Sequence, residues 1–447
     1  MQAVILAGGL GTRLRPLTYP VPKPMLPVGN RPALALTIDA LVNAGCGEVI
    51  VTTNYLAEVV EAGIVEMNSP IPVRCIQEDK PLGTAGCIKN CIDQLGDEFL
   101  VIMGDAVADI DYRHLIEFHH AKKADVTIAV MRVEDTREFG IVALDDDRRI
   151  TRFQEKPRPE EAFSDLANAG FYVLKRDVFD YVPPGVPFDF SRDLVPRLME
   201  QDRRFYAWAL RSYWFDIGRI GTYLESNQQV IAGRTEIGPG AVIPDSATLV
   251  PPFLIASRVR IGDDCVIGPG TVLGERCIIG AQTNIARSVV YQDVSIGAGA
   301  RLNDCVVAKG SRLGNNVSIE PRAVIGERCI VGDGAQVSAY SRVGPLQPVQ
   351  AGATVSGEVS PSLEQLERIR RAIANERFFR DLPPDQRWVC VLLAEFGEMT
   401  ARALAEVGSI PYSRIHSILH QLETHHIVLS TPDVPKRYAL TREVPNT

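Results

Sequence analysis

Short apolar runs alternate with stretches of helical periodicity over the first 231 residues. The apolar runs have the length of strands and occupy residues 2–7, 48–54, 73–77, 99–105 and 125–133. Between them, apolar residues at helical spacing predict helices over 34–43 and 56–67, from 86 onward, and over 112–122. This alternation predicts an α/β fold, a Rossmann-like doubly wound sheet that binds ligands at the carboxyl ends of its strands.

A different period begins near residue 235. From Ile237 to Val343 an aliphatic residue recurs every six positions, with one residue dropped before Val290 and another before Val307. A small residue usually follows four places later, as Cys265, Cys277 and Cys329 do. Hexapeptide repeats of this kind predict a parallel β-helix over 235–345, and the pattern is similar to that of the left-handed form.

The last hundred residues follow neither pattern. Residues 346–361 are rich in Pro and Gly and are expected to form a linker. An amphipathic helix begins near Leu363, and three further helical stretches cover 386–395, 400–407 and 413–424. Two short strands around a turn follow over 427–440. Residues 362–447 are therefore expected to form a helix followed by a small winged-helix-like α+β domain.

Composition narrows the class of protein. The chain of 447 residues carries a net charge of −8, which argues against a general nucleic-acid coat. No apolar run approaches the ~18 residues of a membrane helix, and the N-terminus lacks the features of a signal peptide. The nine cysteines contain no CxxC pair, so we expect reduced thiols in a cytoplasmic protein without a membrane partner.

The first strand ends in a loop suited to phosphate. Glycines let the backbone turn sharply and approach a ligand closely, and exposed N–H groups beside fixed cations favour polyphosphate. The cations Arg13, Arg15 and Lys23 follow the glycines. The expected nucleotide-binding residues of this stretch are Leu6, Ala7, Gly8, Gly9, Gly11, Thr12 and Arg13.

Two aspartates stand where a metal bound to those phosphates could be reached. Asp105 lies where the apolar strand FLVIM ends, and Asp216 lies in the string YWFDIG. Mg²⁺ prefers one or two carboxylates together with phosphate oxygens and water. Asp105 alone could equally be an ordinary turn residue, and Asp111 is expected to cap the helix that follows it.

The strings AGGLGTRLRPLT and PKPMLPVGNRP together resemble the signature of the sugar-nucleotide pyrophosphorylases, the sugar-1-phosphate nucleotidyltransferases. The resemblance extends over residues 1–231, because FGIV, EKP and NAGFYV follow in the order of that family. It implies Mg²⁺ on Asp105 and Asp216, with Arg13 and Lys23 as further catalytic residues. It also implies a sugar-phosphate site with Gly140, Glu155, Lys156 and Asn168.

The nucleobase is expected to meet the string RCIQEDKPLGTAG, which includes Gln77, Glu78, Gly83 and Thr84. Glu78 could accept hydrogen bonds from N1–H and the 2-amino group of guanine, whereas Gln77 could pair with uracil or thymine. The string ExxPLGTAG resembles that of mannose-1-phosphate guanylyltransferases. This favours GTP and mannose 1-phosphate, or a related hexose or heptose 1-phosphate. Thymidylyl, uridylyl or adenylyl transfer to glucose 1-phosphate is the alternative.

The two remaining parts of the chain could add functions. None of the seven histidines lies in the hexapeptide repeat, which argues against acyl transfer and favours a scaffold for a homo-oligomer. Residues 381–447 carry six Lys/Arg and eight Asp/Glu, a net charge of 6 − 8 = −2, which favours a regulatory protein partner over DNA. Another possibility is a regulator that senses sugar nucleotide and acts through the winged-helix domain.

Overall fold

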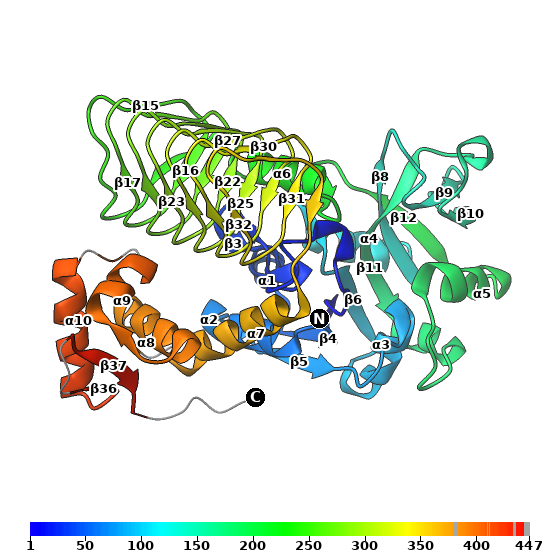
Figure 1. Cartoon of the computed structure of the whole chain (residues 1–447). Coiled ribbons are helices and arrows are strands. Elements are labelled where there is room, and N and C mark those ends of the chain that lie inside the picture. The colour runs from blue at the N-terminus through cyan, green and yellow to red at the C-terminus, as the bar shows by residue number, and fades with distance from the viewer. Residues whose placement is uncertain (380–381, 409, 411, 432–434, 442–447) are drawn as a thin grey trace. The chain divides into compact units, whose positions relative to one another are not determined.

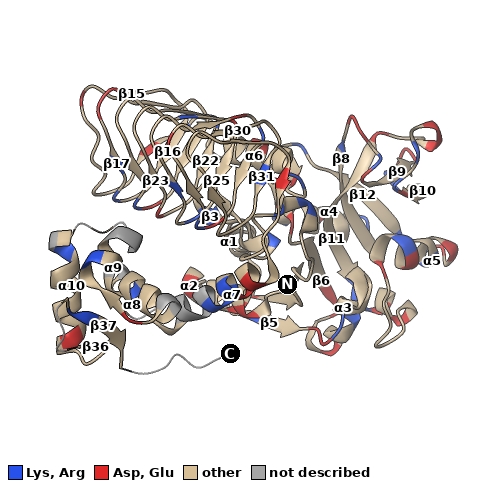
Figure 2. Cartoon of the chain, viewed as in Figure 1, with Lys and Arg blue, Asp and Glu red and all other residues tan. Residues whose placement is uncertain are grey.

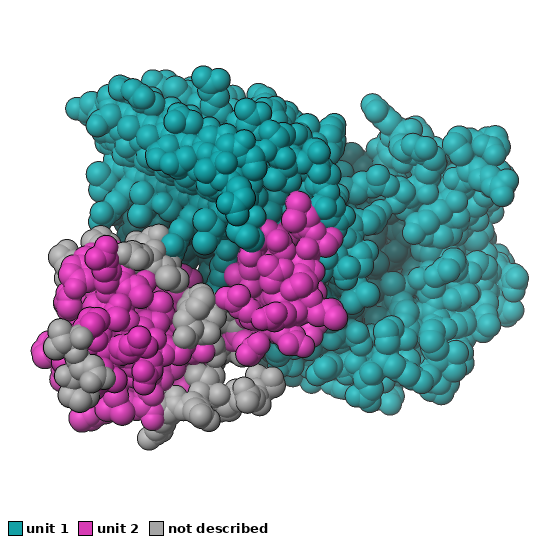
Figure 3. All heavy atoms as spheres, viewed as in Figure 1, with its two compact units in different colours: residues 1–343, 348–358 teal, residues 344–347, 359–447 magenta. Residues whose placement is uncertain are grey.

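The computed structural model describes residues 1–447 except 380–381, 409, 411, 432–434 and 442–447 (Figure 1). The chain forms two compact units (Figure 3). Unit 1 contains residues 1–343 and 348–358, and unit 2 contains residues 344–347 and 359–447. Among the described residues, no helix combines the length and apolar character needed to cross a membrane.

A nine-stranded mixed sheet forms the centre of the N-terminal domain (Figure 1). The main strand order is β10-β9-β11-β6-β1-β4-β5, and β8 pairs with both β11 and β12. Neighbours among β5, β4, β1 and β6 are parallel, whereas β11 is antiparallel to β6 and β8. The strands are β1 (Gln2–Leu6), β4 (Glu48–Thr53), β5 (Val73–Gln77), β6 (Glu98–Met103), β8 (Val126–Arg132), β9 (Gly140–Leu144), β10 (Ile150–Glu155), β11 (Leu166–Lys175) and β12 (Phe205–Ala209).

Helices separate β1, β4, β5, β6 and β8 in the expected alternation, so the predicted α/β fold is confirmed. The α-helices of this domain are α1 (Ala33–Asn43), α2 (Ala57–Met67), α3 (Gly83–Asn90), α4 (Tyr112–Ala121), α5 (Val195–Glu200) and α6 (Ile220–Val230). Two short ladders lie beside the main sheet, β2 (Pro27–Val28) with β3 (Arg31–Pro32) and β7 (Ala106–Ala108) with β13 (Trp214–Asp216).

Helix α4 shows how local sequence sets an element. Asp111 precedes the helix, and its carboxylate accepts a 3.0 Å hydrogen bond from the backbone N–H of His114, so the predicted cap is confirmed. Tyr112, Leu115 and His119 are buried, at the spacing that one helical face requires.

The hexapeptide repeat folds as the predicted parallel β-helix with three faces. Aligned residues in successive coils are 18 positions apart, except for two successive 17-residue steps that correspond to the two dropped residues, as in Ile279, Ile296 and Leu313. The first face consists of β14 (Thr235–Ile237), β16 (Phe253–Ile255), β19 (Thr271–Leu273), β22 (Val289–Val290), β25 (Val306–Val307), β28 (Val324–Ile325), β31 (Arg342–Val343) and β34 (Glu358–Val359). The second face consists of β15 (Thr248–Leu249), β18 (Val266–Ile267), β21 (Asn284–Ala286), β24 (Arg301–Asn303), β27 (Ser318–Ile319), β30 (Gln336–Val337) and β33 (Thr354–Val355). The third face consists of β17 (Arg260–Ile261), β20 (Ile278–Ile279), β23 (Ser295–Ile296), β26 (Arg312–Leu313), β29 (Ile330–Val331) and β32 (Pro348–Val349).

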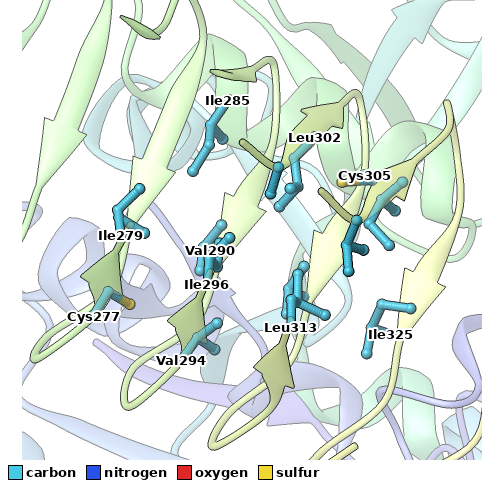
Figure 4. Close-up of a cluster of buried hydrophobic side chains, with 14 of the residues drawn as sticks. Cys277, Ile279, Ile285, Val290, Val294, Ile296, Leu302, Cys305, Leu313 and Ile325 are labelled. Carbon is cyan, nitrogen blue, oxygen red and sulfur yellow. The ribbon is translucent and has the colours of Figure 1, made fainter. Parts of the chain in front are cut away.

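Inward aliphatic side chains of neighbouring coils stack into one core (Figure 4). The small-residue positions complete that core: Cys265, Cys277 and Cys329 are fully buried, and Cys305 lies among them. Burial raises the pKa of the Cys277 thiol to about 12. None of the nine cysteines, all of which lie in the described part of the chain, forms a disulfide bond.

The expected linker over 346–361 was wrong in large part. Strands β32, β33 and β34 lie within these residues and pair with β29, β30 and β31, so they extend the β-helix by another coil. The glycine and proline content that suggested a linker belongs to the corners between two-residue strands, where tight turns are needed.

The β-helix packs against the N-terminal domain within unit 1. The side chains of its first face that point outward form an apolar row, which belongs to the same buried cluster as Leu14 and Ile217 of the N-terminal domain. Tyr223 on α6 donates to the carbonyl of Pro27 at 2.5 Å and lies 2.8 Å from the hydroxyl of Tyr291. The row consists of Leu254, Val272, Val289, Val306 and Val324.

Unit 2 contains helices followed by a small antiparallel sheet. Its elements are α7 (Leu363–Phe378), α8 (Pro384–Phe396), β35 (Met399–Thr400), α9 (Ala401–Gly408), α10 (Tyr412–Thr424), β36 (Val428–Ser430) and β37 (Arg437–Leu440), with sheet order β35-β37-β36. Leu404, Ile415 and Leu422 are fully buried in its core. The predicted helices and last two strands occur in the expected order, but β35 between α8 and α9 was not predicted. Part of the predicted turn between the last two strands, residues 432–434, lies outside the described residues.

Candidate functional site

The glycine loop leaves the carboxyl end of β1 in the middle of the sheet. Gly11 has a φ of 58°, and a Cβ there would lie 3.0 Å from Cγ2 of Thr18, so this position requires glycine. A Cβ on Gly9 would meet nothing within 4 Å, which leaves that backbone open to a ligand. Thr12 begins a short 3-10 helix, η1 (Thr12–Leu14), and is exposed. The loop thus presents bare backbone at a strand end, as phosphate binding requires.

The strand end itself is fixed by its neighbours. The N–H of Ala7 donates to Thr52 at 2.9 Å, and the carbonyl of Leu6 accepts from Gly104 at 3.0 Å. A Cβ on Gly104 would lie 2.6 Å from the oxygen of Leu6, so only glycine lets these two backbones meet. The next residue is Asp105, which this contact brings beside the loop.

Lys23, Asp105 and Asp216 come together from three distant segments. The ammonium of Lys23 lies 2.6 Å from Oδ2 of Asp105 and 3.1 Å from Oδ1 of Asp216. The lysine side chain is 9% exposed, whereas the aspartates are 38% and 28% exposed, so the carboxylates face solvent and the cation lies beneath them. The ladder of β7 and β13 aligns Asp216 with Ala106, which explains why the two carboxylates converge.

Two carboxylates aimed at one point suit a divalent cation that completes its shell with phosphate oxygens and water. Among the described residues, no group of three or more His, Cys, Asp or Glu side chains is placed to hold a metal ion. Asp105 and Asp216 are the two carboxylates of this cluster that could hold such a cation together with phosphate oxygens.

Arg13 lies close to Asp216, one of these two carboxylates. Its guanidinium donates to Glu138 at 2.7 Å, and the other oxygen of Glu138 accepts from Arg219 at 2.9 Å. A Cβ on Gly218 would lie 2.8 Å from Nη2 of Arg13 and 2.9 Å from Oδ1 of Asp216. Arg13 and Asp216 therefore flank the same glycine, and the arginine side chain is 51% exposed toward solvent.

Glu78 follows β5 and is buried beneath the glycine loop. Its Oε2 would lie 3.7 Å from a Cβ on Gly8, and its Oε1 is buried without a hydrogen-bond partner among the described residues. Burial raises the pKa of the Glu78 carboxyl, although the Leu82 backbone and the Cys87 thiol act in the opposite direction. A buried acceptor left without a donor is costly, so this carboxyl is poised for a ligand that donates hydrogen bonds.

The other predicted base-binding residues differ from Glu78. Gln77 is exposed at the end of β5. Gly83 packs on the segment before α5, because a Cβ there would lie 2.7 Å from the oxygen of Phe188. The hydroxyl of Thr84 accepts from the N–H of Phe190 at 2.7 Å and donates to Asp189 at 3.1 Å. Gly83 and Thr84 thus anchor the start of α3 in the fold.

The predicted sugar-phosphate residues lie on β9, β10 and β11, except Lys156, which directly follows β10. A Cβ on Gly140 would meet Oε2 of Glu155 at 2.8 Å, so the glycine makes room for that carboxylate. Burial raises the pKa of Glu155, and nearby Lys156 counteracts this. Lys156 is exposed, with its ammonium 3.9 Å from Oε1 of Glu155. Glu155 and Lys156 therefore act as a neighbouring acceptor and cation.

Asn168 is held by its own strand. Its amide donates to the hydroxyl of Tyr172 at 2.7 Å and its carbonyl accepts from the N–H of Gly170 at 3.0 Å. Burial raises the pKa of Tyr172, and the charges of Glu155 and Asp105 add to this effect.

These groups form one cluster at the carboxyl ends of the strands: a bare loop, two carboxylates with a lysine, and a cation beside them. A model of the nucleotidyl transferase family matches residues 2–233 and therefore covers the whole cluster. The chain belongs to the nucleotidyl transferase family. A second family model, the GMPPB C-terminal domain, matches residues 249–356 of this nucleotidyl transferase, which lie in its β-helix.

Relatives of this nucleotidyl transferase bear the names of sugar-nucleotide enzymes. A probable mannose-1-phosphate guanylyltransferase 1 from Oryza sativa is 31% identical over 78% of this chain and 96% of its own length. A mannose-1-phosphate guanylyltransferase from Mycobacterium tuberculosis is 33% identical over 69% of this chain and 83% of its own. A UTP--glucose-1-phosphate uridylyltransferase from Synechocystis is 32% identical over 69% of this chain and 87% of its own.

Sequence reasoning missed several residues of this nucleotidyl transferase site. Glu138 stands two residues before Gly140 in the string EFGIVALD, and its position there was the available signal. Asp189 accepts from Ser191 and Arg192 at the start of a helical turn, as an aspartate before a helix commonly does. Arg342 donates to the carbonyls of Arg13 and Arg15 from 329 and 327 residues away, and no local pattern signals such a contact.

Proposed function

We propose that this nucleotidyl transferase moves a guanylyl group from GTP to mannose 1-phosphate or a related hexose or heptose 1-phosphate. The buried carboxyl of Glu78 is the observation that carries the choice of base. Its unpartnered Oε1 and its position beside Gly8 suit a base that donates from two adjacent groups, as guanine does. The names of the rice and mycobacterial relatives support the same choice.

The proposed reaction is an in-line displacement. An oxygen of the sugar 1-phosphate forms a bond to the α-phosphorus of GTP, and the bond from that phosphorus to the bridging oxygen of pyrophosphate breaks. The glycine loop and Arg13 would hold the departing phosphates, and Lys156 would bind the sugar phosphate beside Glu155. Such transfers depend mainly on positioning and charge neutralisation.

Lys23 would supply positive charge at the reacting phosphates. Its ammonium lies beneath Asp105 and Asp216, so both carboxylates can approach the same point without strong mutual repulsion. We propose that these carboxylates hold Mg²⁺ when nucleotide binds. The metal would neutralise phosphate charge and align the two substrates.

Pyrophosphate release by the purified protein tests this proposal. GTP, UTP, ATP and dTTP are each paired with mannose 1-phosphate and glucose 1-phosphate, with and without Mg²⁺. We expect GTP with mannose 1-phosphate to exceed every other pair by about tenfold or more in kcat/KM, and chelation of Mg²⁺ to abolish turnover. Preference for UTP with glucose 1-phosphate would replace the proposed substrates by those that the Synechocystis relative's name states.

The absence of turnover with every pair would contradict the proposed enzyme and favour a sensor of sugar nucleotide.

We also propose a homo-oligomer formed through the β-helix. Ile278 and Ile330 project outward from one β-helix face and are 43% and 58% exposed. Ile330→Glu should lower the molar mass measured by light scattering, with Gln336→Glu on another face as control.

For unit 2 we propose a winged-helix domain that binds a regulatory protein. Basic and acidic residues are both present on this unit (Figure 2), and residues 381–447 have a net charge of −2, which gives DNA little electrostatic attraction. Tyr412 and Leu429 are 55% and 60% exposed, as residues of a protein interface often are. Salt-sensitive binding of duplex DNA to the full chain would reverse this choice.

A further inference from the structure

The outward row of the β-helix ends in a charge. Along the first face, register pairs Leu254, Val272, Val289, Val306 and Val324 in succession, and the next partner is Arg342 on β31. The five apolar members pack against the N-terminal domain, in the same cluster as Leu14. Arg342 therefore stands at the point where this packed interface meets the loop that contains Leu14.

The guanidinium of Arg342 donates to two backbone carbonyls of the loop after β1. Its Nη1 donates to the carbonyls of Arg13 and Arg15, both at 2.9 Å. Hydrogen bonds from a charged donor are short and strong, and one nitrogen that serves two carbonyls fixes their separation. The residue between them, Leu14, is completely buried. The three-residue segment is thus held by its side chain in the middle and by its carbonyls on both sides.

This segment carries Arg13, whose side chain flanks Gly218 beside Asp216. A second arginine of the β-helix contacts α6, the helix that follows Asp216. Arg322 donates to Glu225 of α6 at 3.0 Å, and its Nη1 lies 2.8 Å from the position of a Cβ on Gly221. Ile217, next to Asp216, is buried against the same apolar row. Both halves of the site therefore rest on the β-helix.

We propose that Arg342 is a positioning residue for nucleotidyl transfer: it holds the 13–15 backbone so that the Arg13 side chain meets the nucleotide phosphates in a productive arrangement. The β-helix is then part of the catalytic apparatus as well as a scaffold. The inference rests on the proposed role of Arg13 in that reaction, and it does not depend on which base or sugar is used.

Three variants of the full-length protein test the proposal. Arg342→Met removes the donors at similar volume, and Arg342→Lys keeps a cation that can donate to carbonyls. Arg258→Met is the matched control, because Arg258 is also a β-helix arginine but pairs with Glu275 inside the β-helix. With the best substrate pair, we expect Arg342→Met to lower kcat by about 10- to 100-fold, as small misplacements of catalytic groups do. KM for the sugar 1-phosphate should stay within about twofold of wild type, and Arg342→Lys should recover most of the loss.

A double-mutant cycle separates positioning from general damage. In an Arg13→Ala background, Arg342→Met should lower kcat by less than about twofold, because its effect passes through Arg13. An equal loss in both backgrounds, or Arg342→Met activity equal to that of Arg258→Met, would overturn the proposal. Arg342→Lys is measured in the same cycle, which keeps the test decisive if the methionine variant does not fold.

Hydrogen exchange gives a readout that needs no turnover. The amides of Leu14, Arg15 and Leu17 donate within the loop to Gly11, Thr12 and Leu14. Arg342→Met should raise their exchange rates by about tenfold relative to Arg258→Met, because the loop opens more often. If the exchange rates of the Arg342→Met variant are unchanged, the role proposed for Arg342 is wrong, whether or not any substrate pair is turned over. If those rates rise but the wild-type protein turns over no substrate pair, only the proposed function is contradicted.

Discussion

At the scale of single residues, the proposed choice of GTP rests on Glu78. Glu78 combines three properties: it is 7% exposed, one of its oxygens is buried without a partner in the described part of the chain, and it lies beside Gly8 of the glycine loop. A purely structural glutamate would be expected to satisfy both oxygens. The combination is that of a binding group whose partner arrives with the substrate.

Glu78→Gln should exchange the base preference. The amide can accept only one of the two hydrogen bonds that guanine donates, so we expect the GTP-to-UTP ratio of kcat/KM to fall by about 100-fold. Gln77→Ala is the control and should leave the ratio unchanged, since Gln77 is exposed. If Gln77→Ala alters the ratio and Glu78→Gln does not, the base is recognised by Gln77.

The pH dependence of GTP binding follows from the same carboxyl. Burial raises the pKa of Glu78, and only the ionised form accepts from both guanine donors. GTP affinity should therefore weaken as pH falls toward that raised pKa. The Glu78→Gln variant should lack this dependence in calorimetric titrations.

His119 makes a separate contribution to stability. It is 1% exposed and its Nδ1 lies 2.8 Å from the hydroxyl of Thr127, and burial lowers its pKa from 6.5 to about 4. Between these values the unfolded chain binds one proton more than the folded chain, so stability decreases as pH falls from 6.5 to 4. Chemical unfolding at pH 7 and pH 5 should show a smaller loss for His119→Gln than for wild type. His114→Gln, on the exposed side of the same helix, should behave as wild type.

The residues of the candidate site could be predicted from the sequence, but the contacts between them could not. Arg13, Lys23, Asp105 and Asp216 could be named because each stands at a strand end or in a motif. Their spacing along the chain, however, contains no signal that Lys23 would lie beneath both carboxylates. Glu138 and Arg342 were missed because they act through contacts between distant segments, which local pattern cannot predict.

At the scale of elements, the first face of the β-helix is the one that packs against the N-terminal domain. Hexapeptide periodicity predicted its inward residues, since a core position repeats at a fixed interval. It could not predict that an outward row would also be apolar and buried, because that depends on the neighbouring domain. The periodicity also continued beyond Val343 through residues whose proline and glycine content concealed it.

Val306→Asp should separate the two domains of unit 1. Val306 is completely buried in the shared cluster, so the substitution leaves an uncompensated charge there and should cost about 3–5 kcal/mol in the free energy of unfolding. The kcat of the variant should also fall, because Leu14 loses the packing of the shared cluster. Gln336→Asp, exposed on another face, is the control for urea unfolding and activity. Equal stability of the two variants would contradict the role given to the row.

At the scale of the whole molecule, every candidate site residue lies in unit 1. A chain that ends at Ser360 should therefore keep kcat within about threefold of the full-length protein, as expected when compact units are independent. A chain that ends at Tyr340 retains most of the β-helix but lacks Arg342, and it should lose activity. Comparable kcat values for the two shortened chains would show that the last coils do not matter for transfer.

The contact of Arg342 with Arg13 also has a consequence for the order of events during synthesis. Arg342, which donates to the backbone of Arg13, is synthesised 329 residues after it. At 5–20 residues per second this delay lasts on the order of tens of seconds. During that interval the N-terminal domain can fold around its sheet, yet its phosphate loop lacks the hydrogen bonds of Arg342. A nascent chain would thus acquire full activity only when translation has passed the end of the β-helix.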